Sequence, residues 1–215
     1  MENIEFCCVG IDIGKKADPS AIVVAQGVYR GKLTVAPVEE YSKDIHYLVP
    51  YLERLPLEMR YPEQVRRFVK VVEATVLNCR FKCPTVEVLV DVTGVGEGVA
   101  DQLEPEIGKL GIRRLNRVRF THGDRATKNI YQINLGKEFM ANRLQILAES
   151  QRVHLDRNNP EAQALAEEML NFDIEVDEEG GAKYGAMRPG THDDLVVALA
   201  LATLRENITG ASIHV

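Results

Sequence analysis

Long apolar runs are missing from the 215-residue sequence: none approaches the ~18 uninterrupted apolar residues of a membrane-spanning helix. A basic leader is missing too, because the opening segment Met1–Phe6 (MENIEF) is acidic rather than positively charged. Both absences argue against a membrane protein and a secreted one. We therefore expect a soluble, cytosolic protein that forms one sizeable α/β domain over residues 1–215.

Positive charge is also scarce, because 26 Lys and Arg stand against 32 Asp and Glu and the net charge is −6. Phosphate binding favours Lys and Arg, so this balance argues mildly against a nucleic-acid partner. That objection weakens if part of the acidic excess is a metal site, since a bound divalent cation reverses the local field.

Basic residues do gather in one segment, where Asp124 is the only acid among them: Arg113, Arg114, Arg117, Arg119, Arg125 and Lys128. A solvated strand and loop explain such a cluster about as well as a rim that binds phosphates. Both interpretations stay open at this point.

Cysteines are few, and their spacing does not favour zinc. The four cysteines form an adjacent pair, Cys7–Cys8, and a second pair, Cys79 and Cys83, without a matching Cys/His pair at a suitable distance. Adjacent cysteines on an apolar strand usually behave as small buried apolar residues, and we expect this for the first pair.

Apolar periodicity predicts a mixed α/β domain. Strands are expected over residues 6–12, 21–26, 33–38, 85–91 and 112–120. Helices are expected over residues 63–77, 97–110, 137–149, 160–170 and 191–205. Three prolines predict a short helix and a loop in residues 44–62, and residues 173–181 suggest an exposed hairpin or loop. The first three strands suggest an antiparallel meander, and the order strand, helix, strand over residues 85–120 implies a parallel pair.

Aspartates stand at the edges of the most apolar elements. Asp12 ends the first buried strand, Asp91 ends the strongest strand, and Asp193 and Asp194 begin the last helix. Turn formation ahead of a glycine is the plain explanation for the first two. A helix N-terminus favours carboxylates by roughly 0.3–1 kcal/mol, which explains the other two as well. Thr191 even has the capping-box spacing to Asp194.

Taken together, the same aspartates are better explained as a metal site. If the first and fourth strands are neighbours and the last helix packs beside them, the carboxylates converge at one end of the sheet. Carboxylates that close repel one another unless a cation holds them. Oxygen ligands without sulfur suit Mg²⁺ or Mn²⁺, and two such ions roughly 4 Å apart can hydrolyse a phosphodiester.

Three motifs resemble those of the nuclease domain of viral terminase large subunits, as found in tailed bacteriophages. Val9–Gly14 (VGIDIG), with Asp18–Ser20 (DPS) before an apolar strand, resembles the opening acidic motif. Val88–Gly94 (VLVDVTG) is similar to the second motif, and Thr191–Ala202 (THDDLVVALALA) closely resembles the closing one. The resemblance spans essentially the whole chain and implies an RNase H-like fold: a mixed sheet, antiparallel first and then parallel, flanked by helices.

The resemblance also implies a site and an activity. Asp12, Asp91 and one or both of Asp193 and Asp194 would hold two divalent cations, Mg²⁺ or Mn²⁺. Asp18 would be an accessory acid and His192 a neighbour of the site. The last two acids are adjacent in sequence, and we favour Asp194 over Asp193 as the direct ligand. The implied activity is metal-dependent cutting of double-stranded DNA with little sequence preference, during viral genome packaging in the cytoplasm of the infected host cell.

The ATPase motor that precedes such nucleases is not expected here. Gly10–Lys16 is one residue short of the Walker spacing and lacks the Ser or Thr after lysine. The sequence is thus expected to be an excised nuclease half or a gene fragment. The implied partners are double-stranded DNA, an ATPase motor domain, a portal protein and a small terminase subunit.

Other function classes remain alternatives. Gly94–Gly98 (GVGEG) after a strand favours a nucleotide-binding α/β domain, but Val99 stands where the dinucleotide fingerprint has its last glycine. A sugar-kinase or actin-like ATPase also opens with a similar strand, yet it needs a second domain for which 215 residues leave little room. An RNase H-like resolvase for branched DNA shares the acidic chemistry, and a non-enzymatic scaffold is the last option.

Overall fold

A computed structural model describes residues 4–15, 18–29, 45–79, 85–112, 115–156, 158–176, 182–186 and 192–204. The strands are β1 Ile4–Asp12, β2 Ala21–Tyr29, β3 Ile45–Arg54, β4 Val86–Asp91, β5 Leu115–Thr121, β6 Ala126–Lys128, β7 Gln132–Gly136, β8 Val153–Leu155, β9 Phe172–Val176 and β10 Ala182–Ala186. The helices are α1 Tyr61–Cys79, α2 Gly96–Gly108, α3 Lys137–Glu149, α4 Pro160–Asn171 and α5 Asp194–Ala202.

Eight of the strands form one mixed sheet in the order β6-β7-β5-β4-β1-β2-β3-β8. The first three strands are antiparallel neighbours, β4, β5 and β7 then run parallel to β1, and β6 and β8 close the two edges. β9 and β10 form a separate antiparallel hairpin. The mixed sheet predicted from the sequence, antiparallel first and then parallel, is therefore confirmed.

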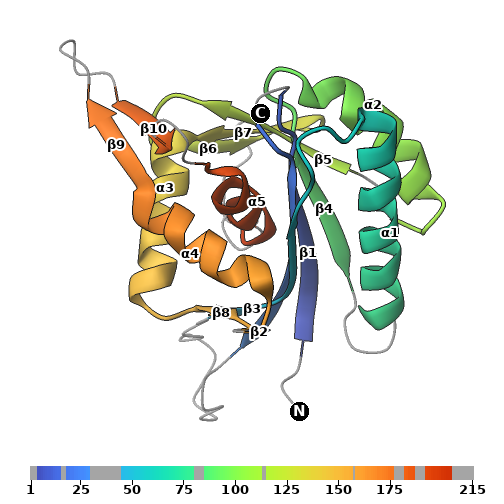
Figure 1. Cartoon of the computed structure of the whole chain (residues 1–215), viewed down its shortest axis with the longest axis horizontal. Helices are drawn as coiled ribbons and strands as arrows, with labels where there is room; N and C mark the ends of the chain where they lie inside the picture. Colours follow the sequence, from blue (N-terminus) through green and yellow to red (C-terminus); the bar gives the residue numbers. More distant parts are fainter. Residues whose placement is uncertain are drawn as a thin grey trace.

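Helices cover both faces of the sheet, with α1 and α2 on one side and α3, α4 and α5 on the other (Figure 1). Each side has its own apolar core. Alternate residues of β1 serve the two cores, as Cys8 packs with α5 and Val9 packs with α1 and α2. A strand that is buried on both faces must be apolar throughout, which explains the continuous apolar run before Asp12.

The most apolar helix, α5, lies directly on β1 and β2. Gly10 permits this close approach, because a Cβ atom there would lie 2.1 Å from the carbonyl oxygen of Ala198 and 2.5 Å from the amide nitrogen of Ala202. Arg143 of α3 binds the other end of α5 through its Nη2, which contacts the carbonyl oxygen of Thr203. The position of α5 over the central strands is thus fixed by a glycine beneath it and by a cation at its C-terminus.

One predicted element is wrong. Residues 44–62 were expected to form a short helix and a loop, but Ile45–Arg54 is strand β3, whose buried residues include Ile45, Tyr47 and Val49. Pro50 misled the prediction. It lies where two residues of β3 face one of β2, at the register shift between Val24 and Gln26, so its missing N–H interrupts no regular ladder.

Other differences are smaller. The strand expected over residues 33–38 lies outside the described residues. The short strands β6, β7 and β8 were not predicted, whereas the hairpin suggested near residues 173–181 is present as β9 and β10. Cys8 is buried in the core beneath α5, and Cys7 is buried against Cys79 between β1 and α1. Within the part of the chain that the structure describes, no helix is long and apolar enough to cross a membrane.

Candidate metal centre

The strand register places charged residues of several strands at the same level, that is, at the same position along the strand direction near one end of the sheet. Asp12 faces Ala21 on β2, and Ala21 faces Arg54 on β3. On the other side of β1, the parallel pair of Ile11 with Val90 brings Asp12 and Asp91 to the same level of neighbouring strands. Strands lie about 4.8 Å apart, so the two carboxylates begin from adjacent backbones at the same end of the sheet.

These side chains share the face of the sheet that α5 covers. Ala21, and Leu89 two residues before Asp91, belong to the core beneath α5, and side chains alternate between faces along a strand. The N-terminus of α5 therefore lies above the row and adds Asp193 and Asp194. The sequence alone predicted this convergence, and the structure brings all four acids to one pocket.

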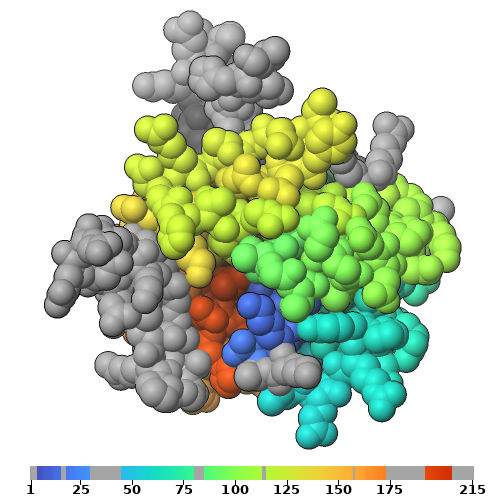
Figure 2. All heavy atoms as spheres, turned by 90° about the horizontal axis from the view of Figure 1, so that it is seen from above, coloured from blue at the N-terminus to red at the C-terminus, as the bar shows by residue number. Residues whose placement is uncertain are grey.

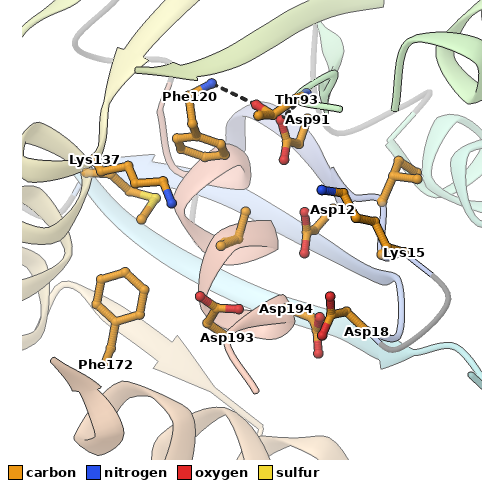
Figure 3. A pocket seen from close by; sticks show the side chains of 14 residues that line it. Asp12, Lys15, Asp18, Asp91, Thr93, Phe120, Lys137, Phe172, Asp193 and Asp194 are labelled. Carbon is orange, nitrogen blue, oxygen red and sulfur yellow. Dashed lines mark hydrogen bonds between the residues drawn. The ribbon is translucent and has the colours of Figure 1, made fainter. Parts of the chain in front are cut away.

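The pocket has a volume of about 260 Å³. Its charged lining consists of aspartates and two lysines: Asp12, Asp18, Asp91, Asp193, Asp194, Lys15 and Lys137. In Figure 3 the carboxylates of Asp12, Asp18 and Asp194 point toward one another, while Asp193 lies on the side of Phe172. Seen from above, atoms of the N-terminal segment (blue) and of the segment that contains α5 (red) are visible side by side (Figure 2).

Burial and mutual repulsion disfavour the charged forms of these acids. Asp12, Asp91 and Asp194 are only 9%, 8% and 3% exposed. Burial raises the pKa of Asp12 well above its ordinary value, and the charges of Asp91, Asp194 and Asp193 raise it further. Burial, followed by the charge of Asp193, raises the pKa of Asp194 to about 7. A cation that enters the pocket would therefore stabilise the charged forms of these carboxylates.

Asp91 has a structural role beside its place in the row. Its Oδ1 accepts a hydrogen bond of 2.7 Å from the backbone N–H of Thr93, and the Thr93 hydroxyl accepts one of 2.9 Å from the N–H of Phe120. Burial raises the pKa of Asp91, while these contacts with Thr93 and the charges of Lys137 and Arg119 lower it. The interpretation as a turn former is therefore true of the contacts with Thr93, and Asp91 lines the pocket as well.

Asp194 supplies an oxygen that the protein does not satisfy. Its Oδ2 is buried and has no hydrogen-bond partner among the described residues. Arg54 Nε and His192 Nδ1 each lie 3.7 Å from this atom. His192 thus lies beside Asp194, as the resemblance implied. The last helix was expected from residue 191, but α5 begins at Asp194, and Asp193 is its N-cap residue, without a side-chain capping bond.

The donor set suits a hard divalent cation. Five aspartates line the pocket, a buried oxygen of Asp194 lacks a donor, and no cysteine takes part. Oxygen-only sites of this kind suit Mg²⁺ or Mn²⁺. Among the residues that the structure describes, no three acidic, His or Cys side chains are yet gathered closely enough to hold an ion.

Two lysines of the pocket were missed by the sequence analysis. Lys15 follows β1, and Lys137 is the first residue of α3. A sequence signal existed for Lys137, because a cation at a helix N-terminus opposes the helix dipole and so calls for another role. For Lys15 the only signal is its position directly after the first acidic motif.

The predicted phosphate-binding cluster is divided by the structure. Arg117 points toward α2, where its guanidinium contacts Glu97, Asp101 and Glu104 at 2.7–2.8 Å, so three carboxylates already satisfy it. We therefore remove Arg117 from the predicted set. The exposed members that remain are Arg119, Arg125 and Lys128, while Arg113 and Arg114 lie outside the described residues.

The glycines after β4 also gain a structural explanation. A Cβ atom at Gly96 would lie 2.0 Å from the carbonyl oxygen of Asp91, and Gly94 has a φ of +75°. These glycines let the chain fold tightly against the end of β4 beside the acidic pocket. Gly94 and Gly96 of the motif that favoured a nucleotide-binding domain are thereby accounted for without a nucleotide, whereas a Cβ atom at Gly98 would meet nothing within 4 Å.

The raised pKa of Asp194 predicts how stability depends on pH without metal. In the unfolded chain this carboxyl titrates near 3.9, whereas in the folded protein burial raises its pKa to about 7. Its stabilising contribution is thus complete below about pH 4 and is lost as pH rises to about 7. We expect Asp194→Asn to raise the melting temperature more at pH 8 than at pH 5, measured in EDTA. An equal effect at both pH values would contradict this prediction.

No protein-family model matches this chain, and a search of curated proteins finds no significant match. Solved structures do match. The large terminase nuclease of thermophilic phage G20c is 21% identical, with 93% of this chain and 82% of that chain covered and a TM-score of 0.58. The nuclease domain of the bacteriophage SPP1 large terminase, with bound Mn, is 14% identical. The match covers 94% of this chain and 88% of that chain, with a TM-score of 0.53.

The terminase nuclease domain of human cytomegalovirus, Mn-soaked and inhibitor-bound, is 14% identical, covers 94% and 82% of the two chains and has a TM-score of 0.55. At these identities the similarity establishes a shared fold. The chain has the fold of the terminase nuclease domains, as its three motifs led us to expect.

Proposed function

We propose that this chain is a divalent-metal-dependent endonuclease that cuts double-stranded DNA with little sequence preference. One observation carries the proposal: Asp12 and Asp91 stand on adjacent strands at one level, and Asp194 enters the same pocket from the helix above them. Structures with the same fold include terminase nucleases solved with bound magnesium and with bound Mn. The site's chemistry and the shared fold support the same class of enzyme.

Within this proposal Asp12, Asp91 and Asp194 hold two divalent cations, Mg²⁺ or Mn²⁺. Asp193 assists, Asp18 is an accessory acid, and His192 flanks Asp194. Such ions, when bound, activate water and stabilise the leaving oxygen of a phosphodiester. The protein's own groups position the substrate: Lys15 and Lys137 offer cations to a phosphate, and Phe120 and Phe172 give the pocket an apolar wall. The exposed side chains of Arg119, Arg125 and Lys128 bind the DNA backbone without reading sequence.

The biological setting follows from the same proposal. The chain would cut DNA during viral genome packaging, in the cytoplasm of the infected host cell. Its partners there would be an ATPase motor domain, a portal protein and a small terminase subunit. These assignments rest on the shared fold and on the motifs around Asp12, Asp91 and Asp194.

Supercoiled plasmid provides the direct test. Purified protein should nick and linearise the plasmid with Mn²⁺ or Mg²⁺ and should be inactive with EDTA. Fragments of many lengths from different plasmids would show low sequence preference. Intact plasmid across full titrations of both metals contradicts the proposal, and efficient cutting of four-way junctions alone would favour a resolvase.

Lys137 should contribute to DNA binding through one phosphate contact. Its ammonium group lines the pocket from the start of α3 and is close enough to lower the pKa of Asp91. Lys137→Ala should weaken duplex binding and lower the slope of log affinity against log salt by about 1. Lys109→Ala is the matched control, because Lys109 is exposed at the C-cap of α2 and paired with Glu106. An unchanged salt slope for Lys137→Ala would contradict a phosphate contact.

A further inference from the structure

A buried acid next to the pocket has no role in the chemistry described so far. Glu168 of α4 is 7% exposed, and it lies on the same buried face of the helix as Ala162 and Leu165. An apolar residue is the usual occupant of such a position. Burial of a carboxylate is costly without partners, so the contacts of Glu168 indicate what it does.

One oxygen of Glu168 caps helix α5. Its Oε2 accepts hydrogen bonds from the backbone N–H groups of Leu195 at 2.9 Å and of Val196 at 3.2 Å. The first N–H groups of a helix have no partner within the helix, and a side chain at the N-cap position often supplies one. Asp193 occupies that position here and makes no side-chain capping bond. Glu168 takes over this role from α4, which packs against α5.

The other oxygen of Glu168 connects α5 to the sheet. Glu168 Oε1 forms an ion pair with Arg54 Nη2, and Arg54 Nε lies 3.7 Å from Asp194 Oδ2. Arg54 ends β3 at the level of Asp12, two strands away, which is about 10 Å at the usual strand spacing. One network of side chains thus joins α4, the last residue of β3 and the first turn of α5.

This arrangement has two consequences for the acids of the pocket. Glu168 satisfies the N–H groups of Leu195 and Val196, so the capping of these two groups does not depend on the side chain of Asp193. Because Arg54 is anchored by Glu168, a fixed cation lies beside Asp194 at the end of β3. Asp194 is thereby held in place with an oxygen that still lacks a hydrogen-bond donor among the described residues.

We infer that Arg54 and Glu168 are positioning residues that fix the first turn of α5 and so hold Asp194 for the metal ions. The inference rests on the proposed function, because it concerns the same metal centre. Neither residue touches substrate or metal in this role. Partners that orient metal ligands in this way typically change metal affinity by about 10–100-fold when they are replaced.

Glu168→Gln is the principal test, since the amide keeps the shape and one acceptor but loses the charge that binds Arg54. We expect the Mn²⁺ concentration for half-maximal plasmid cutting to rise about tenfold, with little change in KM for DNA. Mn²⁺ binding without DNA, followed by electron paramagnetic resonance, should weaken by a similar factor. Hydrogen exchange should accelerate at the amides of Leu195 and Val196. Glu167→Gln is the matched control, because Glu167 is the exposed neighbour on α4.

Arg54→Lys and Arg54→Ala provide a second pair that does not depend on the folding of the Glu168 variant. Lysine keeps the charge and should restore most of the Mn²⁺ affinity that alanine loses. If the wild type binds Mn²⁺ and both Glu168→Gln and Arg54→Ala bind it with unchanged affinity, the inference is wrong. The proposed function would not be affected by that result. Wild-type protein that neither binds Mn²⁺ nor cuts DNA overturns the proposed function and the inference together.

Discussion

Replacing Asp12 or Asp91 by asparagine is expected to abolish DNA cutting while the fold stays intact. Each change removes one charged ligand from the row of carboxylates beneath α5. Metal-ion catalysis contributes several kcal/mol in the transition state, and each 1.36 kcal/mol is a factor of ten in rate. We therefore expect plasmid cutting to fall by about a hundredfold or more in each variant at saturating Mn²⁺.

The same variants should keep or raise the melting temperature measured in EDTA. Burial raises the pKa of Asp12 and of Asp91, so the charged carboxylates are unfavourable in the folded protein without metal. Asparagine removes that charge, and at position 91 it retains an oxygen to accept the N–H of Thr93. Mn²⁺ should raise the melting temperature of the wild type more than that of either variant.

Glu73→Gln is the matched control, because Glu73 is exposed on α1, on the opposite side of the sheet. It should leave cutting, melting temperature and the Mn²⁺ effect unchanged. A large fall in melting temperature for Asp12→Asn or Asp91→Asn would instead mean that these acids are structural turn formers. Full activity in both variants would mean that the site has been placed wrongly.

The core of the site could be predicted from the sequence because buried strands leave a strong signal. β1 and β4 are apolar throughout, since helices cover both faces of the sheet, and an acid that ends such a strand is conspicuous. α5 is recognisable for the same reason, as it is apolar around nearly its whole circumference. Asp12, Asp91 and the paired acids of α5 therefore stand out in the sequence itself.

The supporting residues could not be predicted because their roles depend on tertiary contacts. Glu168 lies on an otherwise amphipathic helix, and only the packing of α4 on α5 makes it buried. Arg54 was not predicted because Pro50 argued against a strand there. Without strand β3, the register that brings Arg54 to the level of Asp12 could not be inferred. Arg117 remained a candidate for phosphate binding because its three acidic partners lie on α2, on another element of the fold.

The two acids at the start of α5 are expected to differ in importance. Asp194 is 3% exposed and has a buried oxygen without a donor among the described residues, whereas Asp193 is half-buried and precedes the helix. Burial and the charge of Asp193 raise the pKa of Asp194 to about 7, so a cation beside this carboxylate would relieve its unfavourable charge. We therefore expect Asp194 to be the direct metal ligand and Asp193 to act beside it.

Asp194→Asn should accordingly eliminate plasmid cutting, and Asp193→Asn should leave a measurable fraction of it. Each variant serves as the matched control of the other, because both remove one charge from adjacent positions of the same helix end. Crystals soaked in Mn²⁺ give an independent measurement through anomalous peaks at bonding distance, about 2.1 Å for a small hard cation, from one carboxylate or both. A peak beside Asp193 alone reverses the assignment. A metal site far from both carboxylates would mean that neither acid is a ligand. The acids at the N-terminus of α5 would then serve the fold and not the metal.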